Sequence, residues 1–296
     1  MRRECFHIVL ATAVLAAVPI KVSAATLDVF VLGGVVMAGV NGAPSNYDDF
    51  SYITGPVETG ATSRTERASA AGPFGSGRAS ASYAVDPTRG QMRLKVDASV
   101  TAVPDGRGGA SSLIQMVLSE SFFVSGTGRV TVGMELDAFW GGENNQVDAC
   151  SSYDATELLS GFDAFNSRCE SYGNYFTGPG AGSVSGRLIE IGFDIDSPEG
   201  GLVDFLWTLN GQTDIGGGGA GLPSATAFLD ASNTANLFFR TEGSVTATPQ
   251  SAGFLSDPAF GGTPQIPPVP LPASALFLLS GLGGLTILRR KIGQRA

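Results

Sequence analysis

The stretch Met92-Arg-Leu-Lys-Val-Asp-Ala-Ser-Val-Thr-Ala102 has apolar residues at even positions and polar residues at odd positions. Because successive side chains of a strand point to opposite faces, this period of two predicts a β-strand with one buried and one wet face. The same strong alternation recurs at 129–140, 189–195 and 203–209. Weaker alternation predicts further strands at 80–85, 113–123, 235–241 and 244–248.

Turn-forming residues separate these segments, at Asp86-Pro87, Pro104-Asp-Gly106, Ser197-Pro-Glu-Gly-Gly201 and Asn210-Gly211. Many strands with one wet face predict antiparallel sheets that share a core. The expected fold class is therefore all-β, an antiparallel and jelly-roll-like β-sandwich. No sustained helical period is present in the body of the chain, apart from a turn or two at 154–159.

The body of the chain is strongly acidic. Residues 25–264 contain 26 Asp or Glu and 11 Lys or Arg, which gives a net charge near −15, while the whole chain has −9 because its two ends are basic. Such a surface repels nucleic acid and anionic lipid, so we expect no nucleic-acid partner. It favours divalent cations or simply solubility.

Residues 1–24 have the layout of a secretory signal peptide. Arg2 and Arg3 precede an apolar core at 8–18, and small residues follow around Ala24 and Ala25. We expect export through the Sec translocon, with cleavage by signal peptidase after Ala24 or Ala25.

The C-terminal segment combines three parts. The motif Val269-Pro270-Leu271-Pro272-Ala273 leads into an uncharged apolar run at 273–288, which ends at Arg289-Arg290-Lys291. A basic cluster stays on the cytoplasmic side of a membrane, so this run is predicted to be a transmembrane helix with the rest of the chain outside. Its sixteen residues make about 24 Å of helix against a hydrocarbon core of about 30 Å. This length suits a tail that is held and then cut better than a permanent anchor.

This tail resembles the PEP-CTERM sorting signal in its Val-Pro-Leu-Pro-Ala (VPLPA) variant. Proteins with such tails resemble one another mainly in this segment, about a tenth of the chain here. The resemblance implies processing by an exosortase-type membrane enzyme, a Gram-negative host, and association with exopolysaccharide or biofilm. A short transmembrane helix behind a proline-rich linker is the alternative reading.

These signals divide the chain into five parts. Residues 1–24 are the signal peptide, and 25–77 form a Gly/Ser/Ala-rich edge or mobile N-terminal arm. Residues 78–250 form the sandwich, 251–268 a proline-rich linker, and 269–296 the sorting signal.

The mature part retains two cysteines, Cys150 and Cys169, because Cys5 belongs to the signal peptide. Two cysteines in an exported protein most simply form one disulfide, which stabilises a loop of this size by about 3 kcal/mol. A metal-binding pair is the alternative, but no histidine of the mature chain could complete a soft metal site.

Histidine-dependent catalysis is excluded, because the single histidine, His7, lies in the signal peptide. Paired carboxylates could still hydrolyse a glycosidic bond. They occur at Glu135, Asp137, Glu190, Asp194 and Asp196, on faces that the alternation predicts to be wet. We therefore expect no catalytic residues and no enzymatic activity.

Two further features are candidate binding sites. Asp194, Asp196 and Glu199 bring oxygen ligands to a strand end and turn, as calcium requires, although their spacing is not that of an EF-hand and ordinary acidic turns are common in acidic proteins. No other cofactor is expected. Six aromatic residues could form a glycan-stacking platform or plug one end of the sandwich: Tyr153, Phe162, Phe165, Tyr172, Tyr175 and Phe176.

Together these features predict a non-enzymatic protein of the cell envelope or extracellular matrix. It would be exported, held by its C-terminal helix, processed, and then released to or retained at the cell surface. The alternative function is a secreted carbohydrate-binding protein or carbohydrate-active enzyme on the same scaffold.

Overall fold

A computed structural model describes most of residues 26–255. The described ranges are 26–39, 46–53, 61–104, 106–159, 161–175, 177, 179–216, 224–251 and 254–255. The predicted cleavage sites at Ala24 and Ala25 lie outside them, as does the whole tail from Val269 to Ala296, so these predictions stay predictions. Among the described residues, none belongs to a helix with the length and hydropathy needed to cross a membrane.

The described chain is almost entirely β-structure, with antiparallel pairing throughout. This confirms the prediction of an all-β antiparallel fold. The elements are β1 Thr26–Gly39, β2 Asn46–Ile53, β3 Thr62–Gly72, β4 Gly75–Asp86, β5 Gln91–Ala102, β6 Gly106–Gly142, β7 Asn144–Asp154, the 3₁₀ helix η1 Gly161–Ala164, β8 Phe165–Gly173, β9 Gly180–Ile215, β10 Ser224–Gly243 and β11 Thr246–Pro249.

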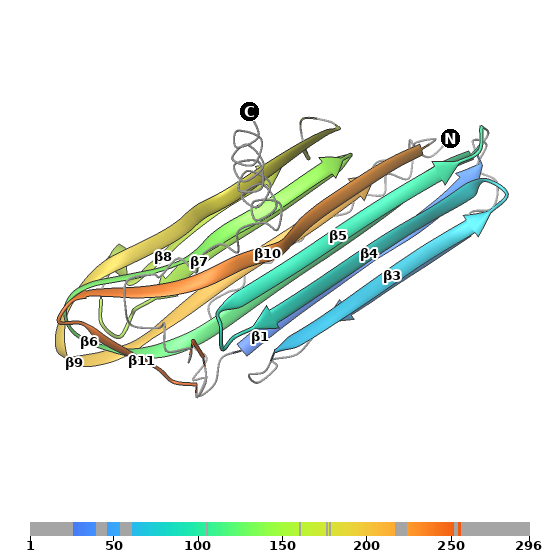
Figure 1. Cartoon of the computed structure of the whole chain (residues 1–296). Helices are drawn as coiled ribbons and strands as arrows, with labels where there is room; N and C mark the ends of the chain where they lie inside the picture. Colours follow the sequence, from blue (N-terminus) through green and yellow to red (C-terminus); the bar gives the residue numbers. More distant parts are fainter. Residues whose placement is uncertain are drawn as a thin grey trace, which may run out of the picture. The chain divides into compact units, whose positions relative to one another are not determined.

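Two long strands, β6 and β9, belong to both layers of the sandwich. The first half of β6 pairs with β1 and with the second half of β9, while its second half pairs with β10 and with the first half of β9. The first sheet therefore has the order β2-β1-β6-β9-β7-β8, and the second has the order β3-β4-β5-β10-β6-β9. Figure 1 shows β3, β4, β5 and β10 side by side in the second sheet.

The chain passes between the sheets where β6 and β9 bend. Val124 pairs with Gly201 and Gly126 pairs with Ser197, so residues 198–200 of β9 have no paired residue on β6. Gly126 and Gly200 have φ values of 111° and 75°, which residues with a Cβ rarely adopt. The predicted turn at Ser197–Gly201 is therefore a bend inside one strand, and it does not end that strand.

The core lies between the two sheets and follows the predicted alternation. In β5, Met92, Leu94, Val96, Ala98 and Val100 are each at most 3% exposed.

Buried hydrogen bonds also join the two layers. Trp207 Nε1 of the first sheet donates to the Gly133 carbonyl of the second at 3.2 Å, and Ser151 Oγ donates to the Ile189 carbonyl at 2.9 Å. The two sheets are thus fixed to each other by packing and by polar contacts.

The predicted turn at Asn210-Gly211 is wrong. Both residues lie inside β9 and pair with β6 and β7. A Cβ on Gly211 would clash with Leu94 of the facing sheet. This glycine serves the close approach of the two layers, a role that the sequence pattern does not distinguish from a turn.

The N-terminal boundary of the sandwich also differs from the predicted residue 78. Strand β1 lies between β2 and β6, and its Val29, Val31 and Val35 are buried in the common core. Residues 26–39, 46–53 and 62–72 are therefore strands of the sandwich, and the mobile-arm alternative does not hold for them.

The described sandwich extends beyond the predicted residue 250. Ser251 donates two hydrogen bonds to the buried Glu120, from its amide at 2.9 Å and from its hydroxyl. Phe254 is 1% exposed, and its ring centroid lies 5.6 Å from that of Trp207 and 6.0 Å from that of Phe122. The first residues assigned to the linker thus complete the core.

Candidate functional site

The predicted disulfide is present. Cys150 on β7 lies directly opposite Cys169 on β8, and their sulfur atoms are bonded. The bond therefore attaches the outermost strand of the first sheet to its neighbour. The metal-pair alternative is excluded, because both thiols are used in the bond.

An ion pair beside the disulfide closes the same side of the sandwich. Arg187, in the half of β9 that belongs to the second sheet, contacts Glu170 on β8 through two nitrogens, at 2.7 and 3.1 Å. Together with the Tyr172 hydroxyl, this guanidinium lowers the pKa of Glu170 to about 2. The bidentate geometry fixes the two side chains more firmly than a single contact would.

The carboxylates considered for catalysis lie on the outer face of the second sheet. Glu190 approaches Arg240 at 3.7 Å, and Asp137 accepts a hydrogen bond from the Gly186 amide at 2.8 Å. Glu135 lies on the same face, opposite Leu188. These three residues lie on the outer face, as the alternation predicted, but their side chains are half-buried. The absence of enzymatic activity stays a prediction.

The candidate calcium ligands are used in contacts between strands. Asp194 forms an ion pair with Arg129 at 3.1 Å, and Asp196 accepts a hydrogen bond from Thr127 at 2.8 Å. Glu199 lies exposed in the bend of β9. Within the described ranges, no group of three or more His, Cys, Asp or Glu side chains gathers in a way that could hold a metal ion.

The aromatic residues proposed as one platform do not share one environment. Tyr153 is buried, packs against Phe193 at 4.6 Å, and donates its hydroxyl hydrogen to the Asp163 carbonyl at 3.2 Å. Phe165 is 57% exposed, and Tyr172 donates to Glu170. The side chains of Phe162 and Phe176 are outside the described part of the chain.

A different aromatic pair is exposed on the second sheet. Phe139 on β6 and Phe228 on β10 are 43% and 37% exposed, and their ring centroids lie 5.9 Å apart. A Cβ on Gly141 would lie 2.7 Å from the Phe228 ring, so this glycine lets the ring cover the neighbouring strand. Sequence reasoning missed this pair, because the two residues are far apart in the chain and Phe139 falls on a face predicted to be polar.

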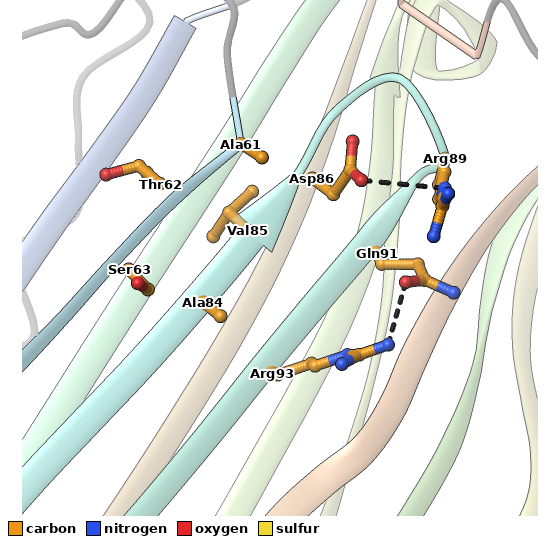
Figure 2. A pocket seen from close by; sticks show the side chains of 9 residues that line it. All are labelled: Ala61, Thr62, Ser63, Ala84, Val85, Asp86, Arg89, Gln91 and Arg93. Carbon is orange, nitrogen blue, oxygen red and sulfur yellow. Dashed lines mark hydrogen bonds and ion pairs between the residues drawn. The ribbon is translucent and has the colours of Figure 1, made fainter.

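A cavity of about 270 Å³ opens at the end of β3, β4 and β5. In Figure 2, Arg89, Gln91 and Arg93 lie along one side, with Ala61 and the first two residues of β3, Thr62 and Ser63, on the other. Arg93 Nη2 donates to Gln91 Oε1 at 2.9 Å, and Arg89 Nε lies 3.7 Å from Asp86 Oδ2. The remaining guanidinium hydrogens and the hydroxyls of Thr62 and Ser63 are donors suited to carboxylates and sugar hydroxyls.

Comparisons with known proteins give no family assignment. No protein-family model matches the chain, and no curated protein matches it. One similar solved structure is that of TmCBM61 in complex with beta-1,4-galactotriose, which is 13% identical with a TM-score of 0.20. The match covers 49% of this chain and 82% of that chain. We assign no ligand and no residue role from a similarity at this level.

Proposed function

We propose that this chain is an exported, non-catalytic protein of the cell envelope or extracellular matrix that associates with exopolysaccharide. The observation that carries the proposal is the disulfide between Cys150 and Cys169, because disulfides form and persist in oxidising compartments outside the cytoplasm. The layout of residues 1–24 and the three-part tail at 269–296 support the same destination.

The proposed route has three steps. The Sec translocon exports the chain, and signal peptidase cleaves it near Ala24. The run at 273–288 then holds the protein in the inner membrane, with Arg289, Arg290 and Lys291 on the cytoplasmic side. An exosortase-type enzyme finally cuts at or near the Val269–Ala273 motif, which releases the sandwich to the surface or the matrix.

The route is tested by intact-mass analysis of surface and matrix fractions from the native host. We expect a chain that begins near Ala25 and ends near Pro272, without any peptide from 289–296. Recovery of that C-terminal peptide from the same population as the surface protein would contradict processing. A protein confined to the cytoplasm, with free thiols at Cys150 and Cys169, would overturn the proposed location.

Absence of catalysis is tested separately, by incubating the purified protein with β-glucans, chitin and bacterial exopolysaccharide. We expect no reducing ends to appear, because the outer-face carboxylates are engaged in contacts such as Glu190–Arg240. Hydrolysis that disappears in Glu135→Gln or Glu190→Gln would show that this face is an active site.

A further inference from the structure

The cationic residues of the sandwich are concentrated in three adjacent strands. Residues 61–102, which span β3, β4 and β5, contain six Arg or Lys and three Asp or Glu. The surrounding region 25–264 contains 26 acidic and 11 basic residues, so these strands carry a net charge of +3 within a body near −15. A local field of opposite sign to that of the whole protein indicates an interaction surface.

Strand register places most of these cations on the outer face of the second sheet. Its successive rows, each read across β3, β4 and β5, are Ser63–Ala84–Arg93, Thr65–Ser82–Lys95, Arg67–Ser80–Asp97 and Ser69–Arg78–Ser99. Each row holds one cation, and the rows follow one another at about 7 Å, the length of two residues in a strand. Arg89 adds a fifth cation at the cavity shown in Figure 2.

We call the surface formed by Arg67, Arg78, Arg89, Arg93 and Lys95 the cationic face. Within the described ranges, Arg67 and Arg78 form no ion pair, while Lys95 is 49% exposed despite its 3.4 Å contact with Asp230. The remaining positions of the rows are mostly serine and threonine. Asp97 is the one acid in these rows, and it accepts a hydrogen bond from the Ser80 hydroxyl. The face therefore presents one cation in every row and a single carboxylate among them.

The exposed aromatic pair adjoins the cationic face. Strand β10 pairs with β5 so that Phe228 lies opposite Asp97 and Asp230 lies opposite Lys95. Phe139 in turn lies opposite Asp230. Aromatic rings present apolar surface that can pack against the C–H face of a sugar ring. One continuous surface thus combines cations, hydroxyls and two aromatic rings.

We propose that the cationic face and the Phe139–Phe228 pair together bind an anionic polysaccharide. Arg67, Arg78, Arg93 and Lys95 contact its carboxylates, and the serine and threonine hydroxyls contact its hydroxyls. The 270 Å³ cavity takes one sugar unit, since pockets that hold a whole drug-sized ligand measure about 300–1,000 Å³. The inference rests on the proposed function, which supplies the polysaccharide as partner. It adds that this polysaccharide is anionic and that the cationic face binds it.

Charge spacing favours this ligand over nucleic acid. Duplex DNA carries one negative charge per roughly 1.7 Å, about four times the linear density of the cationic face. The acidic surface elsewhere on the sandwich would also repel such a polymer. A carboxylated glycan has at most about one charge on each sugar ring, which suits cations spaced at about 7 Å. A neutral glycan would leave these cations without partners.

The test compares binding of the purified protein to polygalacturonate, to its neutral methyl ester and to duplex DNA. We expect preferential binding to polygalacturonate, weakened by rising salt as exposed charges are screened. The double variant Arg67→Gln/Arg78→Gln should weaken it by about tenfold or more, because each lost contact is a charge-assisted hydrogen bond. Phe228→Ala should also weaken it.

A matched control removes the same charge elsewhere. The double variant Arg107→Gln/Arg168→Gln changes β6 and β8 within the first sheet, away from the cationic face. Its binding should therefore equal that of the unmodified protein. Circular dichroism checks that each variant is folded. The inference would be overturned if the protein did not bind polygalacturonate, or if it bound the methyl ester equally well or preferred DNA. It would also be overturned if the Arg67 and Arg78 changes had no effect on binding. None of these outcomes would alter the fractionation and mass results that test the proposed export.

Discussion

The outer faces of the two sheets differ in charge although they cover one core. The outer face of the first sheet has one cation, Arg107, among the described residues and several acids, namely Asp28, Asp49, Asp148, Asp154, Asp204 and Asp214. The cationic face on β3–β5 has the opposite balance. The net charge of −9 for the whole chain therefore describes neither surface. Partner chemistry has to be argued for each face separately.

The two faces also differ in how they respond to pH. Burial raises the pKa of Asp28, Asp204 and Asp214, and the nearby Asp154 and Glu157 raise that of Asp204 further. These carboxyls therefore lose their charge sooner on acidification than free aspartates do. Arginine remains charged throughout, so mild acid reduces the negative charge of one face while the other keeps its cations.

The largest effect is expected from the core that both faces share. Phe254→Ala should lower the free energy of unfolding by about 3–5 kcal/mol, because loss of the ring leaves a new cavity in the core beside Phe122 and Trp207. Urea denaturation measures this loss, and hydrogen exchange should show lower protection in β5 and β9 together. The exposed Phe165→Ala is the control, with an expected change below about 0.5 kcal/mol. Lower protection on one sheet alone would mean that the two faces do not share a cooperative core.

The second largest loss of stability is expected from breaking the disulfide, and this loss should affect the first sheet more than the second. Cys150→Ser should lower the free energy of unfolding by about 2–5 kcal/mol, with the greatest loss of exchange protection in β7 and β8. Reduction of the unmodified protein should reproduce this change. Non-reducing peptide mapping should first recover Cys150 and Cys169 in one cross-linked peptide. Free thiols in the envelope protein would refute the bond.

A pH-dependent effect should follow on the acidic face. The folded-state pKa of Asp214 is raised by burial, so its contribution favours folding below its unfolded pKa and is lost as pH rises through the folded value. Asp214→Asn should therefore match the unmodified protein near pH 3 and become the more stable of the two towards pH 7. Denaturation midpoints across this range measure the difference. A constant offset at all pH values would contradict the burial argument.

The smallest effect is expected on the cationic face. Lys95→Gln removes the contact with Asp230 at 3.4 Å, and because Lys95 is 49% exposed the loss should be only about 0.2–1 kcal/mol. This loss should shrink in high salt. A loss as large as that of Cys150→Ser would mean that Lys95 supports the fold, and that the cationic face is not free for a partner.

Alternation predicted the strands well because it reports burial directly. Residues 92–100 follow the expected pattern without exception, and the disulfide was predicted from the cysteine count and the expected export. The unbroken length of β9 was harder to predict. Gly200 lies at a bend within this strand, and Gly211 lies where the strand closely approaches the facing sheet. Local sequence treats both as turn signals, and the facing Leu94 that explains Gly211 is distant in the chain.

The proposed binding surface could not be predicted, because it depends on register. Arg67, Arg78, Arg93 and Lys95 have no regular spacing in sequence and come into successive rows only when β3, β4 and β5 pair. Phe139 and Phe228 likewise meet only through the pairing of β6 with β10. The described aromatic residues at 153, 165 and 172 lie in different environments for the same reason, since strand position decides which rings face the core.

The length of β6 and β9 has a consequence for folding kinetics. These strands of 37 and 36 residues pair across the whole sandwich, so that Ala110 meets Ile215. Forming such pairs closes large loops, and the chain loses this conformational entropy before stabilising contacts are made. Folding is therefore expected to take about milliseconds to seconds or longer. The first sheet cannot be completed until the end of β9 has emerged from the ribosome, and the second cannot be completed until β10 has. We therefore expect the nascent chain to remain unfolded during synthesis, the state in which a polypeptide can be threaded through a translocation channel.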